Sequence, residues 1–206
     1  MIEIKNEHYI SEGLARTCYY HPNNKDLCIK IGKPGVEVKH LYKEINYYKK
    51  INKKDTSKFA YTFYAAYHGE IATNLGTGFI YSLIKDEVSN QTSLTLRHYL
   101  EMQNSILDDT TIITALKRLK EQLIKHKIFV GDLRARNICC KILKDNSLEL
   151  VVVDGLGHRD FFPFADWFHY FAKKKVDRRF TKAKLNTLSE QRNLIKELRL
   201  AGEIII

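Results

Sequence analysis

Apolar positions in the first quarter of the chain form two short β-type runs and then one helical stripe. The runs Thr17–Tyr20 and Leu27–Ile31 are separated by the turn formers of His21–Asp26, which predicts a β-hairpin. Residues 36–52 instead repeat apolar side chains at steps of three and four, which predicts a helix with one apolar face. The members of that face are Val38, Leu41, Ile45, Tyr48 and Ile51.

Two further strands are predicted between this helix and the first long polar stretch. The segments Tyr61–Tyr67 and Gly78–Ile84 are rich in aromatic and β-branched residues, which favour strands. The polar stretch Lys85–Ser93 follows them. It is the predicted boundary between two parts of one domain, residues 1–88 and residues 89–206.

The second part is predicted to be mainly helical. Leu94–Met102 has the pattern of a helix, and a longer helix follows, for which Asp108, Asp109 or Thr110 can provide the N-cap. The apolar stripe of the longer helix consists of Ile113, Leu116, Leu119, Leu123 and Ile124.

One predicted strand pair interrupts the helices. Ile138–Leu143 and Leu148–Val153 are apolar runs on either side of the Lys144–Ser147 turn. Strands followed by helices predict an α+β fold, with a β-rich part that holds one helix and a short, mainly helical part.

Composition argues against several classes of protein. The 206 residues are 44% hydrophobic, which is enough to bury a core and is unlike a disordered chain. The N-terminus lacks the apolar stretch of a secretory signal, and no apolar run approaches the ~20 residues of a membrane span. We therefore expect a cytoplasmic protein whose four cysteines are reduced thiols. The eight histidines have no metal-binding spacing.

The segment 131–137 concentrates the candidate chemistry. It places Asp132, Arg134 and Asn137 in one loop between a helix and a strand. Asp154 follows at the end of an apolar strand, directly before a glycine. Carboxylate and amide oxygens are ligands of hard cations such as Mg²⁺, and Asp132 would then be available to accept a proton from a substrate hydroxyl. An Asp and an Asn alone would more often make turns and caps, so the following strand pair and Asp-Gly turn give the pattern its specificity.

Lys30 and Glu44 supply a second candidate site. Lys30 lies among apolar residues of a predicted strand, and Glu44 lies on the helix that follows it. Each residue alone would usually be an ordinary surface residue. A lysine held by a glutamate can instead be directed at nucleotide phosphates.

In this order along the chain, Lys30, Glu44, Asp132, Asn137 and Asp154 resemble the site residues of the protein-kinase fold. More closely, the chain resembles the YrbL family of small bacterial kinase-like proteins, which is linked by name to the PhoP regulatory network. The segments that carry this resemblance are Cys18-Tyr19, His21-Pro22, Cys28–Ile31, Tyr47-Tyr48, Gly76–Gly78 with Tyr81, and Asn137-Ile138. The resemblance implies a minimal bilobal kinase-like fold.

The resemblance also implies roles for the loop residues. Asp132 would orient an acceptor hydroxyl and take its proton, and Arg134 would neutralise charge on the transferring phosphoryl group. Asn137 and Asp154 would hold Mg²⁺.

The β-rich part would bind the nucleotide. Lys30, held by Glu44, would contact the α- and β-phosphates of ATP. The glycine-rich loop expected before Lys30 is reduced to Gly13, and Arg16 could supply a side-chain contact in its place. The acceptor could be a small molecule, an envelope sugar or lipid, or a protein.

The positive charge is concentrated near the C-terminus. Lys and Arg number 34 against 24 Asp and Glu, a net charge of +10, and residues 173–199 carry ten of the former and three of the latter. Two interpretations stay open for this segment. It is the solvated face of a basic C-terminal helix, or it is a docking surface for an anionic partner such as a lipid head group, a phosphosugar or nucleic acid. The aromatic residues of Phe161–Phe171 are predicted to belong to the core.

Three functions follow in order of preference. The first is an ATP- and Mg²⁺-dependent phosphotransferase that acts on a hydroxyl group. The alternative is a nucleotide-binding pseudokinase that acts as a regulatory binding module. The third is a basic nucleic-acid-binding protein, although the sequence contains no motif for specific nucleic-acid recognition.

Overall fold

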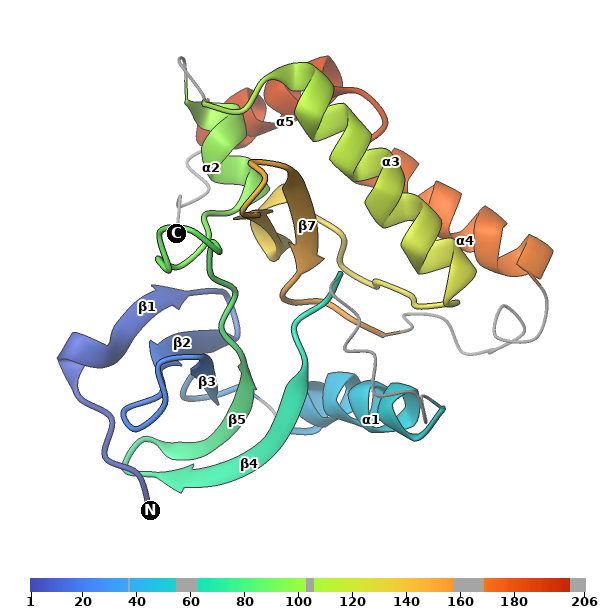
Figure 1. Ribbon diagram of the computed structural model, residues 1–206. Helices are drawn as coiled ribbons and strands as arrows, with labels where there is room; N and C mark the ends of the chain where they lie inside the picture. The colour runs from blue at the N-terminus through green and yellow to red at the C-terminus, as the bar shows by residue number, and fades with distance from the viewer. Residues whose placement is uncertain (37, 55–62, 103–105, 158–168, 201–206) are drawn as a thin grey trace. The chain divides into compact units, whose positions relative to one another are not determined.

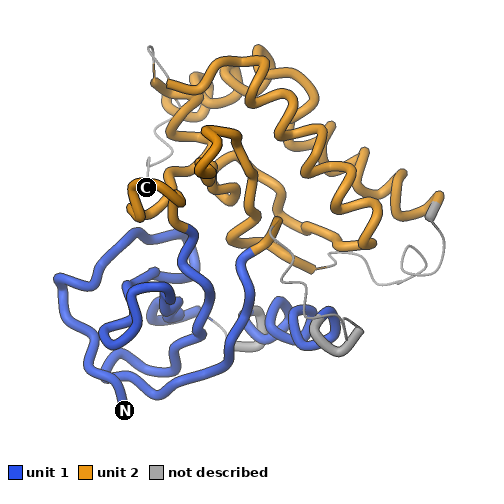
Figure 2. The backbone as a smooth tube through the Cα atoms, in the orientation of Figure 1, with its two compact units in different colours: residues 1–61, 65–84, 206 blue, residues 62–64, 85–205 orange. Residues whose placement is uncertain are grey.

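The computed structural model of the protein describes residues 1–36, 38–54, 63–102, 106–157 and 169–200. The chain forms two compact units, which Figure 2 shows in blue and orange. Both strands and helices are present, so the α+β class predicted from the sequence is confirmed.

The two units differ in their secondary structure. The first contains Met1–Tyr61 and Ala65–Ile84, together with Ile206. The second contains Thr62–Tyr64 and Lys85–Ile205. Most of the strands lie in the first unit and most of the helices in the second.

A five-stranded antiparallel sheet forms the centre of the first unit (Figure 1). Its strands are β1 (Tyr9–Glu12), β2 (Arg16–Tyr20), β3 (Leu27–Gly32), β4 (Tyr67–Thr73) and β5 (Gly76–Ser82), in the spatial order β1-β2-β3-β5-β4. A short 3-10 helix, η1 (Asn6–His8), precedes β1. Strands β2 and β3 form the predicted hairpin, with Cys18 opposite Lys30.

Helix α1 (Val38–Lys54) packs on one face of this sheet and confirms the helix predicted from the apolar stripe. Its buried stripe residues are Leu41, Ile45, Tyr48 and Ile51. The ring of Tyr48 lies 5.4 Å from the ring of Tyr81 on β5. Gly32 has no side chain at a point where the helix approaches closely, since a Cβ atom there would lie 2.9 Å from Leu41 Cδ1.

The strand predicted over Tyr61–Tyr67 is wrong for residues 63–66, and Tyr61 and Thr62 lie outside the described residues. Strand β4 begins only at Tyr67, and Tyr64 forms an isolated bridge with Val152. The side chains of Phe63 and Tyr64 are buried, and their rings pack edge to face at 5.5 Å. The aromatic run therefore reflects burial in the core, which favours the same residue types as a strand does.

Helices and one strand pair form the second unit. Its elements are α2 (Leu96–Glu101), α3 (Asp109–Lys125), η2 (Ala135–Asn137), β6 (Ile138–Ile142), β7 (Leu148–Val152), α4 (His169–Lys182) and α5 (Leu188–Leu200). The antiparallel pairing of β6 with β7 confirms the predicted strand pair. Helix α3 packs against α4 and β7 (Figure 1).

Helix α3 begins where the sequence suggests, but its buried face is rotated from the predicted one. The Asp108 carboxylate accepts a hydrogen bond from the Thr111 amide at 2.7 Å, so Asp108 is the N-cap. Ile112 is fully buried, whereas the predicted stripe residue Ile113 is 38% exposed. Ile112 continues the three- and four-residue steps of the buried leucines, and one residue along a helix turns a side chain by about 100°.

The basic C-terminal region forms two helices in place of the single predicted one. The turn between α4 and α5 contains Lys184 with a positive φ of 53°. Tyr170 and Phe171 are 69% and 48% exposed, so the prediction that they belong to the core is wrong. The rest of that aromatic stretch, Phe161–Phe168, lies outside the described residues. No helix in the described ranges is long and apolar enough to cross a membrane.

The four cysteines are not joined in disulfides, as expected from the sequence. Cys28, Cys139 and Cys140 are buried. Burial raises the pKa of the Cys140 thiol, which keeps that side chain uncharged near neutral pH. These three cysteines therefore act as small core residues.

Candidate functional site

Two segments of the second unit carry most of the predicted chemistry. We call them the Asp132 loop (residues 131–137) and the Asp154 turn (residues 153–157). Strands β6 and β7 are antiparallel, with Ile138 opposite Val152. The residues just before β6 and just after β7 are therefore brought to the same end of the strand pair.

Backbone hydrogen bonds join these two segments directly. The Gly155 carbonyl oxygen accepts hydrogen bonds from the amides of Gly131 and Asp132, at 2.8 and 3.2 Å. The Asn137 carbonyl oxygen accepts one from the Val153 amide at 2.9 Å. The loop and the turn are thus connected at both ends of the loop, and their polar side chains belong to one local site.

The Asp132 side chain is held by two residues of its own loop. Arg134 Nε lies 2.8 Å from Asp132 Oδ1. Asn137 Nδ2 donates to the Asp132 carbonyl oxygen at 2.9 Å and lies 3.4 Å from Asp132 Oδ2. The Asp132 side chain nevertheless stays 29% exposed. The carboxylate is therefore oriented by its neighbours and remains accessible to a ligand.

Gly155 allows the loop and the turn to approach this closely. Its φ of +79° lies in the left-handed region that favours glycine. A Cβ atom at this position would lie 2.8 Å from the Asp132 carbonyl oxygen and 2.9 Å from Asp132 Cβ. Any larger residue would have to displace Asp132.

Asn137 and Asp154 offer oxygen donors that suit a hard cation. The Asn137 amide nitrogen is engaged with Asp132, so its Oδ1 is the atom that could bind a metal. Asp154 Oδ1 accepts a hydrogen bond from the Gly155 amide at 2.7 Å. No group of three or more His, Cys, Asp or Glu that could hold a metal occurs within the described ranges. This pair fits Mg²⁺ that takes its other ligands from water and a phosphate-bearing ligand.

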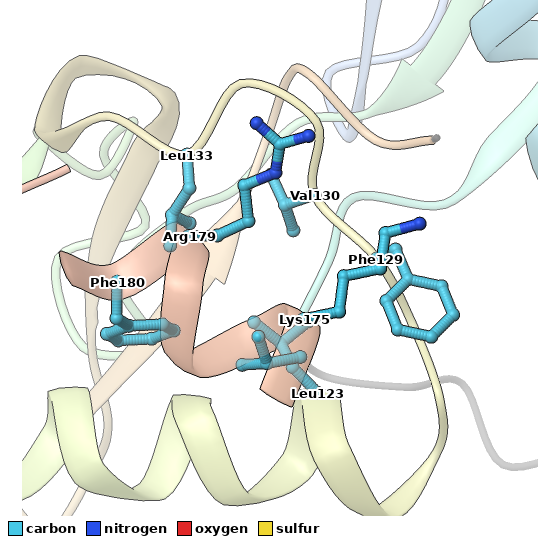
Figure 3. Close-up of a pocket in the computed structure, with 8 residues that line it drawn as sticks. Leu123, Phe129, Val130, Leu133, Lys175, Arg179 and Phe180 are labelled. Carbon is cyan, nitrogen blue, oxygen red and sulfur yellow. The ribbon is translucent and has the colours of Figure 1, made fainter. Parts of the chain in front are cut away.

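A small pocket separates the start of the Asp132 loop from helix α4 (Figure 3). It leaves room for about one water molecule, so it cannot hold a nucleotide. Lys175 Nζ lies 4.8 Å from the centre of the Phe129 ring, in a cation–π contact. Arg179 extends from α4 toward the segment that carries Val130 and Leu133 (Figure 3). Helix α4 therefore supports the segment that leads into Asp132.

Lys30 is buried on the face of the first unit's sheet that α1 covers. It is opposite Phe79 on β5, whose ring packs on Tyr42 of α1. Only 8% of Lys30 is exposed, and its Nζ lies 4.7 Å from the centre of the Tyr81 ring. Lys30 is therefore not an ordinary surface lysine. Of the two interpretations from the sequence, a lysine directed at nucleotide phosphates is the one that stays open.

Glu44 of α1 forms an ion pair with Arg16 at the start of β2. Arg16 Nη2 lies 2.6 Å from Glu44 Oε2, and each side chain is 11% exposed. Arg16 is opposite Gly32, so Arg16 and Lys30 are diagonal neighbours on one sheet face. The pairing of Lys30 with Glu44 stays a prediction. Gly13, the remaining loop candidate, donates its amide to the Arg16 carbonyl at 2.7 Å and closes the β1–β2 turn.

The Arg16–Glu44 pair is expected to be more strongly coupled than a more exposed ion pair that also involves α1. A double-mutant cycle with Arg16→Ala and Glu44→Ala should give a coupling energy of about 1–3 kcal/mol, because both groups are largely removed from water. The matched control is Lys49–Glu70, with a 3.5 Å separation and side chains 51% and 33% exposed. Its coupling should stay below about 1 kcal/mol. Urea titration measures both values, and equal coupling energies would contradict the expectation.

Sequence reasoning missed three contacts that shape these sites. Tyr81 contacts Lys30, Gly155 contacts Asp132, and Lys175 contacts the segment before the Asp132 loop. All three contacts join residues far apart in the sequence, so no local pattern indicates them.

Comparison with known proteins identifies the family to which this chain belongs. The family model described as PhoP regulatory network protein YrbL matches residues 2–187. The chain belongs to the YrbL family. The uncharacterized YrbL proteins of Escherichia coli (strain K12) and Shigella flexneri are each 30% identical to it over 184 residues, covering 86% of this chain and 84% of each relative.

The YrbL match includes every candidate site residue in both units. It begins before Gly13 and extends beyond Asp154 and helix α4, and it ends before α5. The family part of the sequence resemblance is therefore confirmed. Both of these relatives are named as uncharacterized.

Proposed function

We propose that this YrbL-family protein is an ATP- and Mg²⁺-dependent phosphotransferase that transfers the γ-phosphate of ATP to a hydroxyl group. One observation carries the proposal: the backbone hydrogen bonds that gather Asp132, Asn137 and Asp154 into one site. A carboxylate base, an amide and a second carboxylate in this chain order are the parts of a kinase-type phosphoryl-transfer site. A minimal bilobal kinase-like fold is part of the same proposal.

Asp132 would act as the base. Its backbone is held by Gly155 and its carboxylate is oriented by Arg134, so it could position an acceptor hydroxyl and accept its proton. Arg134 is 49% exposed and could contribute positive charge near the transferring phosphoryl group. In phosphoryl transfer, positioning and charge neutralisation supply most of the catalysis.

Asn137 and Asp154 would hold the metal, and Lys30 would contact the nucleotide phosphates. A bound Mg²⁺ supplies charge neutralisation on the phosphate oxygens. The Asn137 Oδ1 atom and the Asp154 carboxylate are donors of the type that Mg²⁺ prefers. Lys30 would provide a cation largely shielded from water, where its attraction to phosphate is stronger than at the surface.

Binding of Mg²⁺-ATP is expected to raise the melting temperature of the wild-type protein but not of Asp154→Ala. At an ATP concentration about a hundred times Kd, the stabilisation is about 2.7 kcal/mol. For a chain of this size, that corresponds to a rise of about 5–10 °C. Thermal melts with and without Mg²⁺ measure the binding, and ADP release in the same samples measures turnover.

Asp145→Ala is the matched control. Asp145 lies in the β6–β7 turn, where its carboxylate accepts a hydrogen bond from the Ser147 amide at 2.9 Å. This variant should respond to Mg²⁺-ATP as the wild type does. A wild-type protein that neither gains stability from Mg²⁺-ATP nor releases ADP would refute the proposal, as would an unchanged response of Asp154→Ala.

A nucleotide-binding pseudokinase is the second candidate, and one observation favours it. The sequence suggested that Arg16 could contact phosphates in place of the missing glycine-loop contacts. Arg16 Nη2 instead lies 2.6 Å from Glu44 Oε2, and this ion pair competes with a contact to phosphate. A pseudokinase would gain thermal stability from the nucleotide and release no ADP with any acceptor tested. The same two measurements therefore separate the candidates.

A further inference from the structure

The basic residues of the C-terminal region face different surroundings. Lys175 and Arg179 line the pocket next to the Asp132 loop (Figure 3). Arg192 of α5 makes a bidentate ion pair with Asp109, with distances of 2.8 and 2.6 Å. These residues serve contacts within the second unit, so they do not explain the rest of the charge on α4.

One side of α4 is exposed and carries both basic and aromatic residues. We call it the α4 surface, and it consists of Tyr170, Phe171, Lys173, Lys174, Arg178 and Lys182, all of them exposed. At about 100° per residue these side chains share one side of the helix. The opposite side is buried through Ala172, Val176 and Phe180.

The acidic residue of α4 does not neutralise this surface. Asp177 pairs with Lys120 of α3, at 2.7 Å between Lys120 Nζ and Asp177 Oδ1. Its charge is therefore balanced at the border between the two helices. The α4 surface presents four cationic side chains along one helix.

The two aromatic residues give the α4 surface an apolar end. Tyr170 is 69% exposed and Phe171 is 48% exposed. Their rings pack edge to face, with centres 5.7 Å apart and planes at 77°. They form one compact apolar group beside Lys173 and Lys174. Exposed aromatic residues next to basic ones are typical of segments that lie in the interface of a bilayer.

We propose that the α4 surface docks the protein on an anionic lipid bilayer. Its lysines and arginine would contact lipid phosphate groups, and Tyr170 and Phe171 would enter the head-group region. A helix with four basic residues on one side reaches the size of basic cluster that binds acidic lipids. This inference does not depend on phosphotransfer, because the α4 surface is separate from the residues of the candidate site.

Nucleic acid is the competing anionic partner, and the composition of the surface disfavours it. Reading of base edges in a duplex uses Arg and Lys for guanine and Asn and Gln for adenine, and the α4 surface contains no Asn or Gln. Single strands bind by stacking successive bases on open aromatic faces. Tyr170 and Phe171 are nearly perpendicular and in mutual contact, so they do not offer two parallel stacking faces.

Vesicle sedimentation with the full-length protein, in the absence of nucleotide, tests the proposal. The protein should bind vesicles of phosphatidylcholine and phosphatidylglycerol in equal parts but not vesicles of phosphatidylcholine alone, and added salt should weaken the binding. Replacement of Lys173, Lys174, Arg178 and Lys182 with Ala should lower the affinity at least tenfold, because each basic residue near an anionic surface contributes about fivefold. Tyr170→Ala with Phe171→Ala should remove the binding that survives at high salt.

A charge-matched variant separates the α4 surface from the net charge of the protein. Replacement of Lys5, Lys25, Lys43 and Lys117 with Ala removes the same charge from exposed positions elsewhere. This control should bind anionic vesicles nearly as the wild type does, and thermal melts should show that both variants are folded. Equal losses in the two variants would overturn the proposal. A second result would also overturn it: the protein binds duplex DNA or single-stranded RNA more tightly than anionic vesicles, and the α4 replacements abolish that nucleic-acid binding.

Discussion

Replacement of Asp132 by Asn is expected to lower the rate of ATP-dependent phosphotransfer by about 10²–10⁴-fold, the usual contribution of a positioned general base. In the wild-type protein, Arg134 Nε lies 2.8 Å from Asp132 Oδ1. Asn keeps the shape of the Asp side chain and one oxygen that can accept a hydrogen bond from Arg134. The backbone bond to Gly155 is unaffected by the change. Binding of Mg²⁺-ATP should therefore persist while proton acceptance is lost.

The measurement combines ADP formation with nucleotide-dependent melting in the same preparations. Asp145→Asn is the control, because it makes the same chemical change in the β6–β7 turn, where Asp145 caps the Ser147 amide. It should retain full turnover. If Asp132→Asn turned over ATP as fast as the wild type, Asp132 would not be the base, whereas loss of nucleotide binding as well would point to damage of the whole site.

Replacement of Gly155 by Ala is expected to lower the free energy of unfolding by about 3 kcal/mol or more. The left-handed backbone costs a residue with a Cβ atom roughly 1 kcal/mol. The larger part comes from overlap, since the new Cβ would lie 2.8 Å from the Asp132 carbonyl oxygen. The Asp132 carbonyl oxygen also accepts a hydrogen bond from Asn137 Nδ2. A displacement of Asp132 would therefore also disturb Asn137, which is a predicted metal ligand.

Gly35→Ala separates backbone strain from overlap. Gly35 has a φ of +81°, close to the +79° of Gly155, but nothing lies within 4 Å of a Cβ built there. This control should lose only about 1 kcal/mol. Urea titration followed by circular dichroism gives both values. Equal losses would show that the contact with Asp132 is not what requires glycine at position 155.

Local patterns predicted several elements of the fold correctly. The turn formers between Tyr20 and Leu27 predicted the β2–β3 hairpin, and the N-cap of α3 is one of the three residues proposed for it. Such features depend on a few neighbouring residues, which the sequence displays directly. The strand predicted over Tyr61–Tyr67 was wrong for residues 63–66, because aromatic residues are favoured in a buried core as well as in a sheet.

The candidate site of the second unit was also accessible to sequence reasoning. One predicted strand pair separates Asp132 and Asn137 from Asp154, and an antiparallel pair necessarily returns the chain to its starting point. The spacing therefore implied proximity. The hydrogen bonds of Gly155 with the Asp132 loop and the contact of Lys175 with Phe129 could not be predicted, because they depend on how the segments pack.

The identity and order of the chemical groups, the α+β class and the family are properties of the linear chain, since they follow from residue types and their spacing. Tertiary packing decided which charges meet. The sequence paired Glu44 only with Lys30, whereas the register of β2 with β3 and the packing of α1 place Arg16 Nη2 2.6 Å from Glu44 Oε2. Packing also divided the basic residues of α4 between a buried side and the exposed α4 surface. Coulomb attraction and burial depend on distance in space, which the order of residues does not specify.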